Sequence, residues 1–144
     1  MTDLERAKAL LADDPTLTCV FCRNGETLTS QKRGIAPPMD FLDADRDLRG
    51  FSVADRIVGR AAALLFVLAG VKEVHAEVLG EGALGVLNES GIPVTYGTLT
   101  PCVITRRGDG PCPMERAVEA IDDPALAREA IRQTLQRLKE KGAN

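Results

Sequence analysis

The chain has 144 residues, of which 44% are hydrophobic and 27% are charged. These values are typical of one globular domain, which we expect over residues 1–144. The formal net charge is -3 and only 3% of the residues are aromatic, which argues against a nucleic-acid-binding surface. The longest apolar run, residues 61–69, is far shorter than the roughly 20 residues of a membrane span. No signal peptide is recognisable, so we predict a cytoplasmic protein without membrane contact.

The first third of the chain predicts a helix, a hairpin and a loop. Residues 3–12 have the pattern of a short amphipathic helix. Asn24 and Gly25 lie inside a strand-like stretch, residues 17–30, and an Asn-Gly pair in that position is the strongest short signal for a β-hairpin. Residues 31–50 have no clear period, and loops of this length are often lids or binding loops.

The middle of the chain predicts a buried helix. Ser52 and Asp55 have the spacing of a helix capping box, with Ser52 as the N-cap. Residues 56–69 are apolar nearly all round, which is typical of a central, buried helix. Gly70 follows and is expected to end it.

The remaining elements alternate between strands and helices. The valines at 74 and 78 alternate with polar residues and predict a strand. Further along we predict a helix at residues 83–88, strands at 94–98 and 102–105, a helix opening at Cys112-Pro113, and a last helix opening at Asp123-Pro124 with an apolar stripe of Leu126, Ile131, Leu135 and Leu138. This order predicts an α/β fold, a sheet covered by helices.

The four cysteines are expected to be reduced thiols, since nothing marks a secreted chain. Cys19 and Cys22 have a C-x-x-C spacing, but in a strand such residues point to opposite faces and do not chelate a metal. The alternative, in which all four cysteines share a structural zinc ion, has irregular spacings. We therefore predict no metal and no cofactor.

Two short motifs resemble those of zinc-dependent nucleobase deaminases, which carry His-x-Glu and Pro-Cys-x-x-Cys. They are His75-Ala76-Glu77 and residues 111–115, but position 115 is Glu rather than Cys. The first motif also lies in a predicted strand, where His75 is expected to be half-exposed beside Glu77. A zinc deaminase with altered ligands remains an alternative, and it would carry stoichiometric zinc.

The order of elements, residues 58–65 and residues 110–115 together resemble an uncharacterised bacterial domain family, over residues 17–121. Ser30, residues 33–35 and residues 54–55 fit the same pattern. The resemblance implies a cytidine deaminase-like three-layer sandwich, with a mixed sheet, an N-terminal hairpin and helices on both faces. It implies no zinc ligands and no established activity, and the last helix (124–141) lies outside this core. That family usually has Lys where this chain has Arg60, and a guanidinium cannot form a Schiff base.

Arg60 is the sole charged residue within residues 57–69. A buried arginine needs a partner, and Asp55 and Glu115 are candidates. One interpretation is a structural ion pair. The other is a cation that holds a phosphate or carboxylate near the helix N-terminus.

Two further groups are candidates for chemistry. Cys112 lies at a predicted helix N-terminus close to Arg106 and Arg107, which would lower the pKa of its thiol, so it is either a nucleophile or a helix cap. Ser30 and Arg33, with Lys32 and Gly34, form a loop that either binds an anion or is simply solvated.

The sequence therefore predicts a protein that binds a small anionic ligand, nucleotide-like or sugar-phosphate-like, at the N-terminal end of the central helix. The proposed ligand-binding residues are Ser30, Arg33, Asp55, Arg60 and Glu115, and the catalytic candidate is Cys112. The alternative is a non-catalytic regulatory or protein-interaction module, or a homodimer, with a degenerate pocket. The sequence assigns no reaction.

Overall fold

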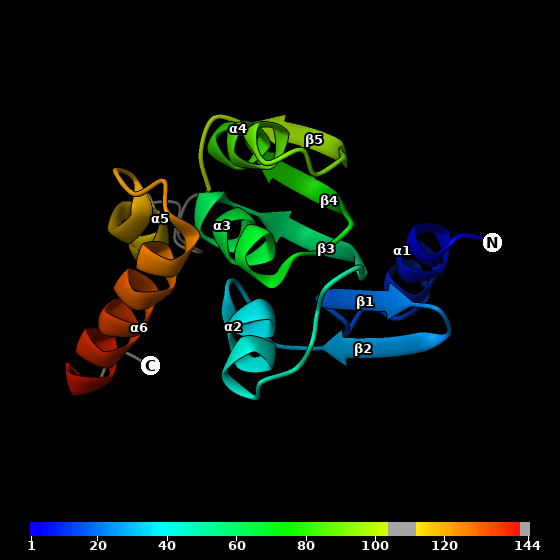
Figure 1. Cartoon of the computed structure of the whole chain (residues 1–144), viewed down its shortest axis with the longest axis horizontal. Helices are drawn as coiled ribbons and strands as arrows, with labels where there is room; N and C mark the ends of the chain where they lie inside the picture. The colour runs from blue at the N-terminus through cyan, green and yellow to red at the C-terminus, as the bar shows by residue number, and fades with distance from the viewer. Residues whose placement is uncertain (104–111, 142–144) are drawn as a thin grey trace.

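The computed structural model describes residues 1–103 and 112–141. Its centre is a five-stranded sheet in the order β2-β1-β3-β4-β5 (Figure 1). The strands are β1 (Cys19–Arg23), β2 (Glu26–Ser30), β3 (Ser52–Val58), β4 (Glu73–Gly80) and β5 (Val94–Thr100). Strand β1 pairs antiparallel with β2 and β3, whereas β3, β4 and β5 run parallel. The predicted α/β class and mixed sheet are confirmed.

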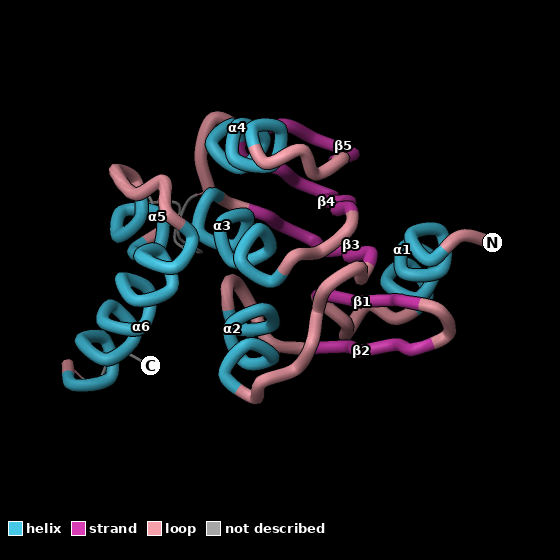
Figure 2. The backbone as a smooth tube through the Cα atoms, in the orientation of Figure 1, coloured by secondary structure: helices cyan, strands magenta, loops and turns pink. Residues whose placement is uncertain are grey.

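Helices cover both faces of this sheet unequally (Figure 2). The helices are α1 (Asp3–Asp13), α2 (Ala36–Asp43), α3 (Arg60–Ala69), α4 (Glu81–Glu89), α5 (Pro113–Val118) and α6 (Pro124–Glu140). Successive residues of β1 divide between two apolar clusters: Phe21 packs in the large one with α3, and Val20 packs in the small one with α1. Because side chains alternate along a strand, α1 lies on the face opposite to the other packed helices.

The N-terminal elements agree with the sequence. Thr2 and Glu5 form a capping box that starts α1, a signal that satisfies free backbone N–H groups at the helix start. The hairpin turn places Asn24 at φ 48° and Gly25 at φ 87°, so both turn residues adopt the left-handed conformation of a type I′ turn. The predicted hairpin is confirmed.

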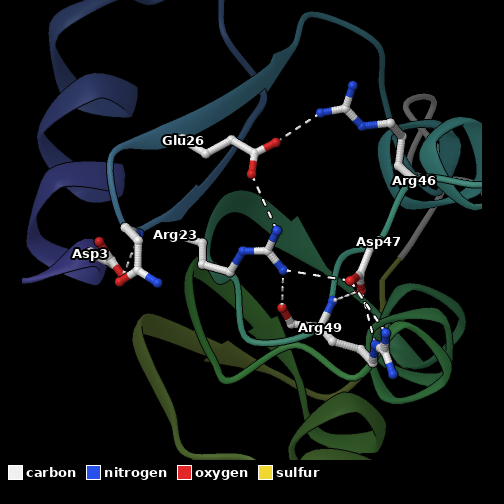
Figure 3. A network of polar contacts seen from close by, with 7 residues as sticks. Asp3, Arg23, Glu26, Arg46, Asp47 and Arg49 are labelled. Carbon is white, nitrogen blue, oxygen red and sulfur yellow. Dashed lines mark hydrogen bonds and ion pairs between the residues drawn. The ribbon is translucent and has the colours of Figure 1, made fainter.

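A network of charged side chains ties the hairpin to the segment between α2 and β3 (Figure 3). Arg23 Nη2 lies 3.2 Å from Glu26 Oε1, and its Nη1 donates to the carbonyl of Arg49 at 2.7 Å. Glu26 also accepts from Arg46 Nη2 at 3.0 Å. The Arg23 guanidinium stacks over the Phe51 ring at 4.3 Å. The network therefore fixes the hairpin against a segment that has no regular structure.

The predicted capping box at Ser52 is wrong. Ser52 and Asp55 lie in strand β3, between β1 and β4, and Ser52 Oγ donates to Glu73 Oε2 at 2.6 Å. A strand buried on both faces shows no polar–apolar alternation, so its sequence does not differ visibly from that of a buried helix. The central helix begins later, at Arg60. It is buried along most of its length, and Gly70 ends it at φ 74°, as predicted.

Residues 31–50 are not one loop, since they contain helix α2. Pro37 and Pro38 lie in its first turn, where a proline ring costs little because the N–H groups have no partner in the helix. The N-cap residue is Ile35, which has no polar side chain, so no helix start signal is present there.

The second half of the chain confirms the strand at 74–78, the helix at 83–88 and the strand at 94–98 within β4, α4 and β5. Cys102 and Val103 lie in no strand, and residues 104 and 105 lie outside the described residues. In α6 the buried side chains are Ala127, Ile131 and Thr134, whereas Leu126 and Leu135 are 61% and 39% exposed. The prediction that Leu126 and Leu135 belong to a buried apolar stripe is therefore wrong. In the described part of the chain, no helix has the length and apolarity needed to cross a membrane.

Candidate functional site

A cavity of about 470 Å³ lies beside the carboxyl end of β3, where the chain passes into α3. Carboxyl ends of parallel strands are the usual ligand-binding edge of α/β sheets. The walls come from four parts of the chain: the segment before β1 (Pro15, Leu17, Thr18), the segment before α2 (Arg33, Gly34, Ile35), the β3–α3 junction (Asp55, Arg56, Ile57, Gly59, Ala62) and the start of α5 with its neighbour (Val103, Cys112, Met114, Glu115). The volume falls in the range of roughly 300–1,000 Å³ that small-molecule sites occupy.

Asp55 is the buried polar group of this cavity. It is 4% exposed, and its Oδ2 atom has no hydrogen-bond partner among the described residues. Burial raises the pKa of Asp55 to about 7, against the opposing effects of the Ile57 and Arg56 backbone N–H groups and the Cys19 thiol. An unpaired buried oxygen costs free energy, so Asp55 is where a ligand group would be most favourable.

Glu115 closes the N-terminal end of α3. Its Oε1 accepts from the backbone N–H of Arg60 at 2.7 Å, and its Oε2 accepts from that of Ala61 at 2.8 Å. The N-cap residue itself, Gly59, has no side chain that could accept these hydrogen bonds. The carboxylate thus fills the position where an anion binds to a helix N-terminus. Glu115 was predicted as a partner of the Arg60 side chain, but it binds the Arg60 backbone instead.

The Arg60 guanidinium does not line the cavity. Its Nε donates to the carbonyl of Val118 at 3.1 Å, and its Nη2 contacts the carbonyl of Ile121 at 2.5 Å and Asp122 Oδ1 at 2.7 Å. The side chain is 21% exposed. Of the two interpretations from the sequence, these contacts favour the structural one, but two carbonyls hold the guanidinium and its ion-pair partner is the exposed Asp122 rather than Asp55 or Glu115.

Two cations line the cavity, Arg33 and Arg56. Arg56 is held by the carbonyl of Leu17 and by Glu77, whereas Arg33 lies at the rim. It is exposed and makes no ion pair with any described residue. Ser30 does not line the cavity: its Oγ accepts from the backbone N–H of Lys32 at 3.1 Å, and Lys32 pairs with Asp40 at 2.7 Å. The structure thus brings Arg33 to the cavity and separates it from the other two polar residues of its loop.

Cys112 lines the cavity at the start of α5 and is partly buried. It occupies the N-cap position, but its side chain makes no capping hydrogen bond. Arg106 and Arg107, which were expected to lower its pKa, lie outside the described residues. A free thiol beside an open cavity is chemically accessible to a bound molecule.

The other thiols and the histidine lie elsewhere. Cys19 and Cys22 belong to different apolar clusters on opposite faces of β1, as predicted. His75 and Glu77 lie in β4, where His75 Nδ1 is 2.7 Å from Thr95 Oγ1 and burial lowers its pKa. Across the described residues, no three His, Cys, Asp or Glu side chains are grouped to hold a metal ion.

The glycine and the apolar walls of the site are not predicted from the sequence. A Cβ on Gly59 would lie 2.4 Å from Glu115 Oε1, so the absence of a side chain there allows the carboxylate to approach the helix. Leu17, Ile57 and Met114 come from three distant parts of the chain. No local pattern brings them together, and only Gly59, directly before the helix, gave a signal that could have been used.

The fold and the cavity define an α/β domain with a small-molecule-sized site at the carboxyl end of β3, the central strand of its sheet. Residues 6–135 match the TM1506 family, a domain of unknown function (DUF1893), and the chain belongs to this family. It is similar to a solved crystal structure of a DUF1893 family protein (TM1506) from Thermotoga maritima, with 28% sequence identity and a TM-score of 0.80. The similarity covers 95% of this chain and 91% of that chain. No curated protein matches the chain.

Proposed function

We propose that this protein binds a small anionic molecule, nucleotide-like or sugar-phosphate-like, in the cavity at the N-terminal end of α3. The observation that carries the proposal is the buried Oδ2 of Asp55, which lines the cavity and has no hydrogen-bond partner among the described residues. Buried polar atoms are nearly always paired, so an orphaned one at a cavity wall favours a ligand that supplies the partner.

The cavity offers three kinds of contact to such a ligand. Asp55 Oδ2 accepts a hydrogen bond from an N–H or O–H group, which both nucleosides and sugars carry. Leu17, Ile57 and Met114 provide an apolar wall for a ring. Arg33 at the rim provides a charge for a phosphate or carboxylate group, because a guanidinium binds such groups with two parallel hydrogen bonds.

The finer fold assignment belongs to the same proposal. A mixed sheet with an N-terminal hairpin and helices on both faces agrees with a cytidine deaminase-like sandwich. We propose binding without zinc deaminase chemistry, since His75 and Glu77 lie outside the cavity lining. Cys112 is the candidate nucleophile because it borders the cavity, whereas Ser30 and Arg60 do not line it and are not expected to touch the ligand.

The test is a binding screen with ligand-observed NMR, using nucleoside monophosphates, sugar phosphates and the matching unphosphorylated compounds. We expect a phosphorylated member to bind, and Ile57→Trp to abolish its binding, because Ile57 is 50% exposed at the cavity wall and can carry a larger ring without disturbing the core. Leu126→Trp is the matched control, since Leu126 is 61% exposed on α6 outside the cavity. If the ligand still binds to Ile57→Trp, its binding site is not this cavity, and the proposal is contradicted.

The alternative, an interaction module, is favoured by one feature of the sheet. Among the described strands, β5 lies at an edge of the sheet, and it exposes Tyr96 (42%) and Leu99 (37%). Edge strands can pair with a second chain. If this alternative holds, sedimentation of the purified protein will show a dimer that Tyr96→Lys dissociates, and the binding screen will return nothing.

A further inference from the structure

The N-terminus of α3 is an anion-binding position that faces the cavity. Its first two backbone N–H groups, from Arg60 and Ala61, both donate to the Glu115 carboxylate, at 2.7 and 2.8 Å. Gly59 and Glu115 both line the cavity, as does Ala62 in the first turn. The first amides of a helix have no partner within the helix and carry the positive end of its dipole. An acidic group in the cavity would therefore meet the same two donors that Glu115 now uses.

Gly59 provides the space that this position needs. Its backbone is at φ -100° and ψ -179°, an extended conformation that other residues adopt easily, so glycine is not required by the turn. A Cβ there would lie 2.4 Å from Glu115 Oε1 and 3.0 Å from Oε2. The missing side chain thus leaves room for two oxygens of an acidic group beside the helix.

A second observation points to a ligand at the same place. Asp55 lines this cavity, is 4% exposed, and leaves its Oδ2 without a partner among the described residues. Burial raises its pKa to about 7, so the carboxyl group is protonated in a large fraction of molecules near neutral pH. A protonated carboxyl donates a hydrogen bond, and an anion beside it would accept one.

We infer that Glu115 is an internal stand-in for the acidic group of the ligand, and that a phosphate monoester or carboxylate binds by displacing Glu115 from the amides of Arg60 and Ala61. This inference rests on the proposed binding function and adds a regulatory step to it. Glu115 belongs to α5, so its displacement frees the start of α5 from α3. Ligand binding and the position of α5 are then coupled, because Glu115 and the acidic group of the ligand cannot bind the two amides at the same time.

The probe is inorganic phosphate. It is titrated into the full chain at constant ionic strength, and its binding is monitored by amide NMR. In the wild type we expect phosphate to shift the Arg60 and Ala61 amides weakly. In Glu115→Ala the same amides shift at phosphate concentrations lower by about tenfold or more, because a tethered competitor acts at a high effective concentration. Glu115→Gln removes the charge but keeps the size, and it should lie between them.

The matched control is the double variant Gly59→Ala with Glu115→Ala. The new methyl group occupies the space that an oxyanion needs, so phosphate should no longer shift these amides. The inference is overturned if Glu115→Ala gains no affinity, or if the double variant binds phosphate as well as Glu115→Ala does. Either result leaves the cavity proposal standing, because that proposal is tested separately with Ile57→Trp.

Discussion

Asp55 holds a carboxyl group whose Oδ2 atom is enclosed by protein without a hydrogen-bond partner among the described residues. The surroundings include the Cys19 thiol from β1, Arg56 on β3, Arg33 before α2 and Glu115 from α5. Burial is the largest influence and favours the neutral form. The residue is thus an acceptor or a donor according to what enters the cavity, which suits a binding site better than a structural ion pair.

The raised pKa of Asp55 predicts a pH dependence of stability. The folded pKa is about 7 and the ordinary value is 3.8, so between these values the folded state binds more protons than the unfolded state. The contribution of Asp55 to the free energy of unfolding is therefore fully present below pH 3.8, and it is lost as the pH rises to about 7. We expect Asp55→Asn to gain a few kcal/mol over the wild type across this window. Urea denaturation of both proteins at several pH values measures it, and parallel curves would contradict it.

Gly59 predicts a coupled pair of substitutions. Gly59→Ala places a Cβ 2.4 Å from Glu115 Oε1, so the carboxylate must move, and we expect a loss of about 1–3 kcal/mol of folding free energy. In a Glu115→Ala background the same substitution should cost much less, since the clash is gone. Chemical denaturation of the four proteins forms a double-mutant cycle. Additive free energies would show that the contact does not restrict position 59.

Helices α3 and α5 are held together by Arg60 at the end of α5. Its guanidinium donates to the carbonyls of Val118, the last residue of α5, and of Ile121, just beyond it. We expect Arg60→Ala to lower the free energy of unfolding by about 1–3 kcal/mol. Asp122→Ala should cost less than about 0.5 kcal/mol, because Asp122 is 96% exposed. Equal losses in thermal or urea unfolding would mean that the ion pair, not the carbonyl contacts, carries the stability.

The hairpin turn and helix α4 provide a matched pair of glycines. Gly25 is at φ 87°, and a Cβ there would meet nothing within 4 Å, so Gly25→Ala should cost about 1 kcal/mol from backbone conformation alone. Gly85 lies inside α4 with equally open space, so Gly85→Ala should gain about 0.4–1 kcal/mol. Urea denaturation checks both. Changes of the same sign would contradict the assigned backbone conformations.

At the level of elements, local signals were sufficient where the chemistry is local. The turn at Asn24 and Gly25, the end of α3 at Gly70 and the N-cap of α6 at Asp123 were all read from one to three residues. Strand β3 was misread because its burial on both faces depends on β1 and β4, which are distant in sequence. Helix α2 was missed because Pro37 and Pro38 suggest a loop unless they occupy a first turn.

Over the whole molecule, the sequence located part of the site but not its geometry. The sequence predicts Arg33, Asp55, Cys112 and Glu115 as site residues, and all four line the cavity. The role of Arg60 as a donor to the end of α5, and that of Glu115 as the cap of α3, depend on how α5 packs against α3. That packing brings together residues more than fifty positions apart, and hydrophobic periodicity in the sequence does not predict it.

The central claim is that the cavity beside Asp55 holds a small molecule, and mass spectrometry of the purified protein tests it most directly. Native and denaturing spectra are recorded side by side for the wild type and for Ile57→Trp, each before and after incubation with the phosphorylated panel. We predict added mass in the native spectrum of the wild type alone, which denaturation removes. Mass that survives denaturation would place a covalent bond, with Cys112 the first residue to map. Bare masses in every spectrum, or equal added mass in Ile57→Trp, would contradict the claim.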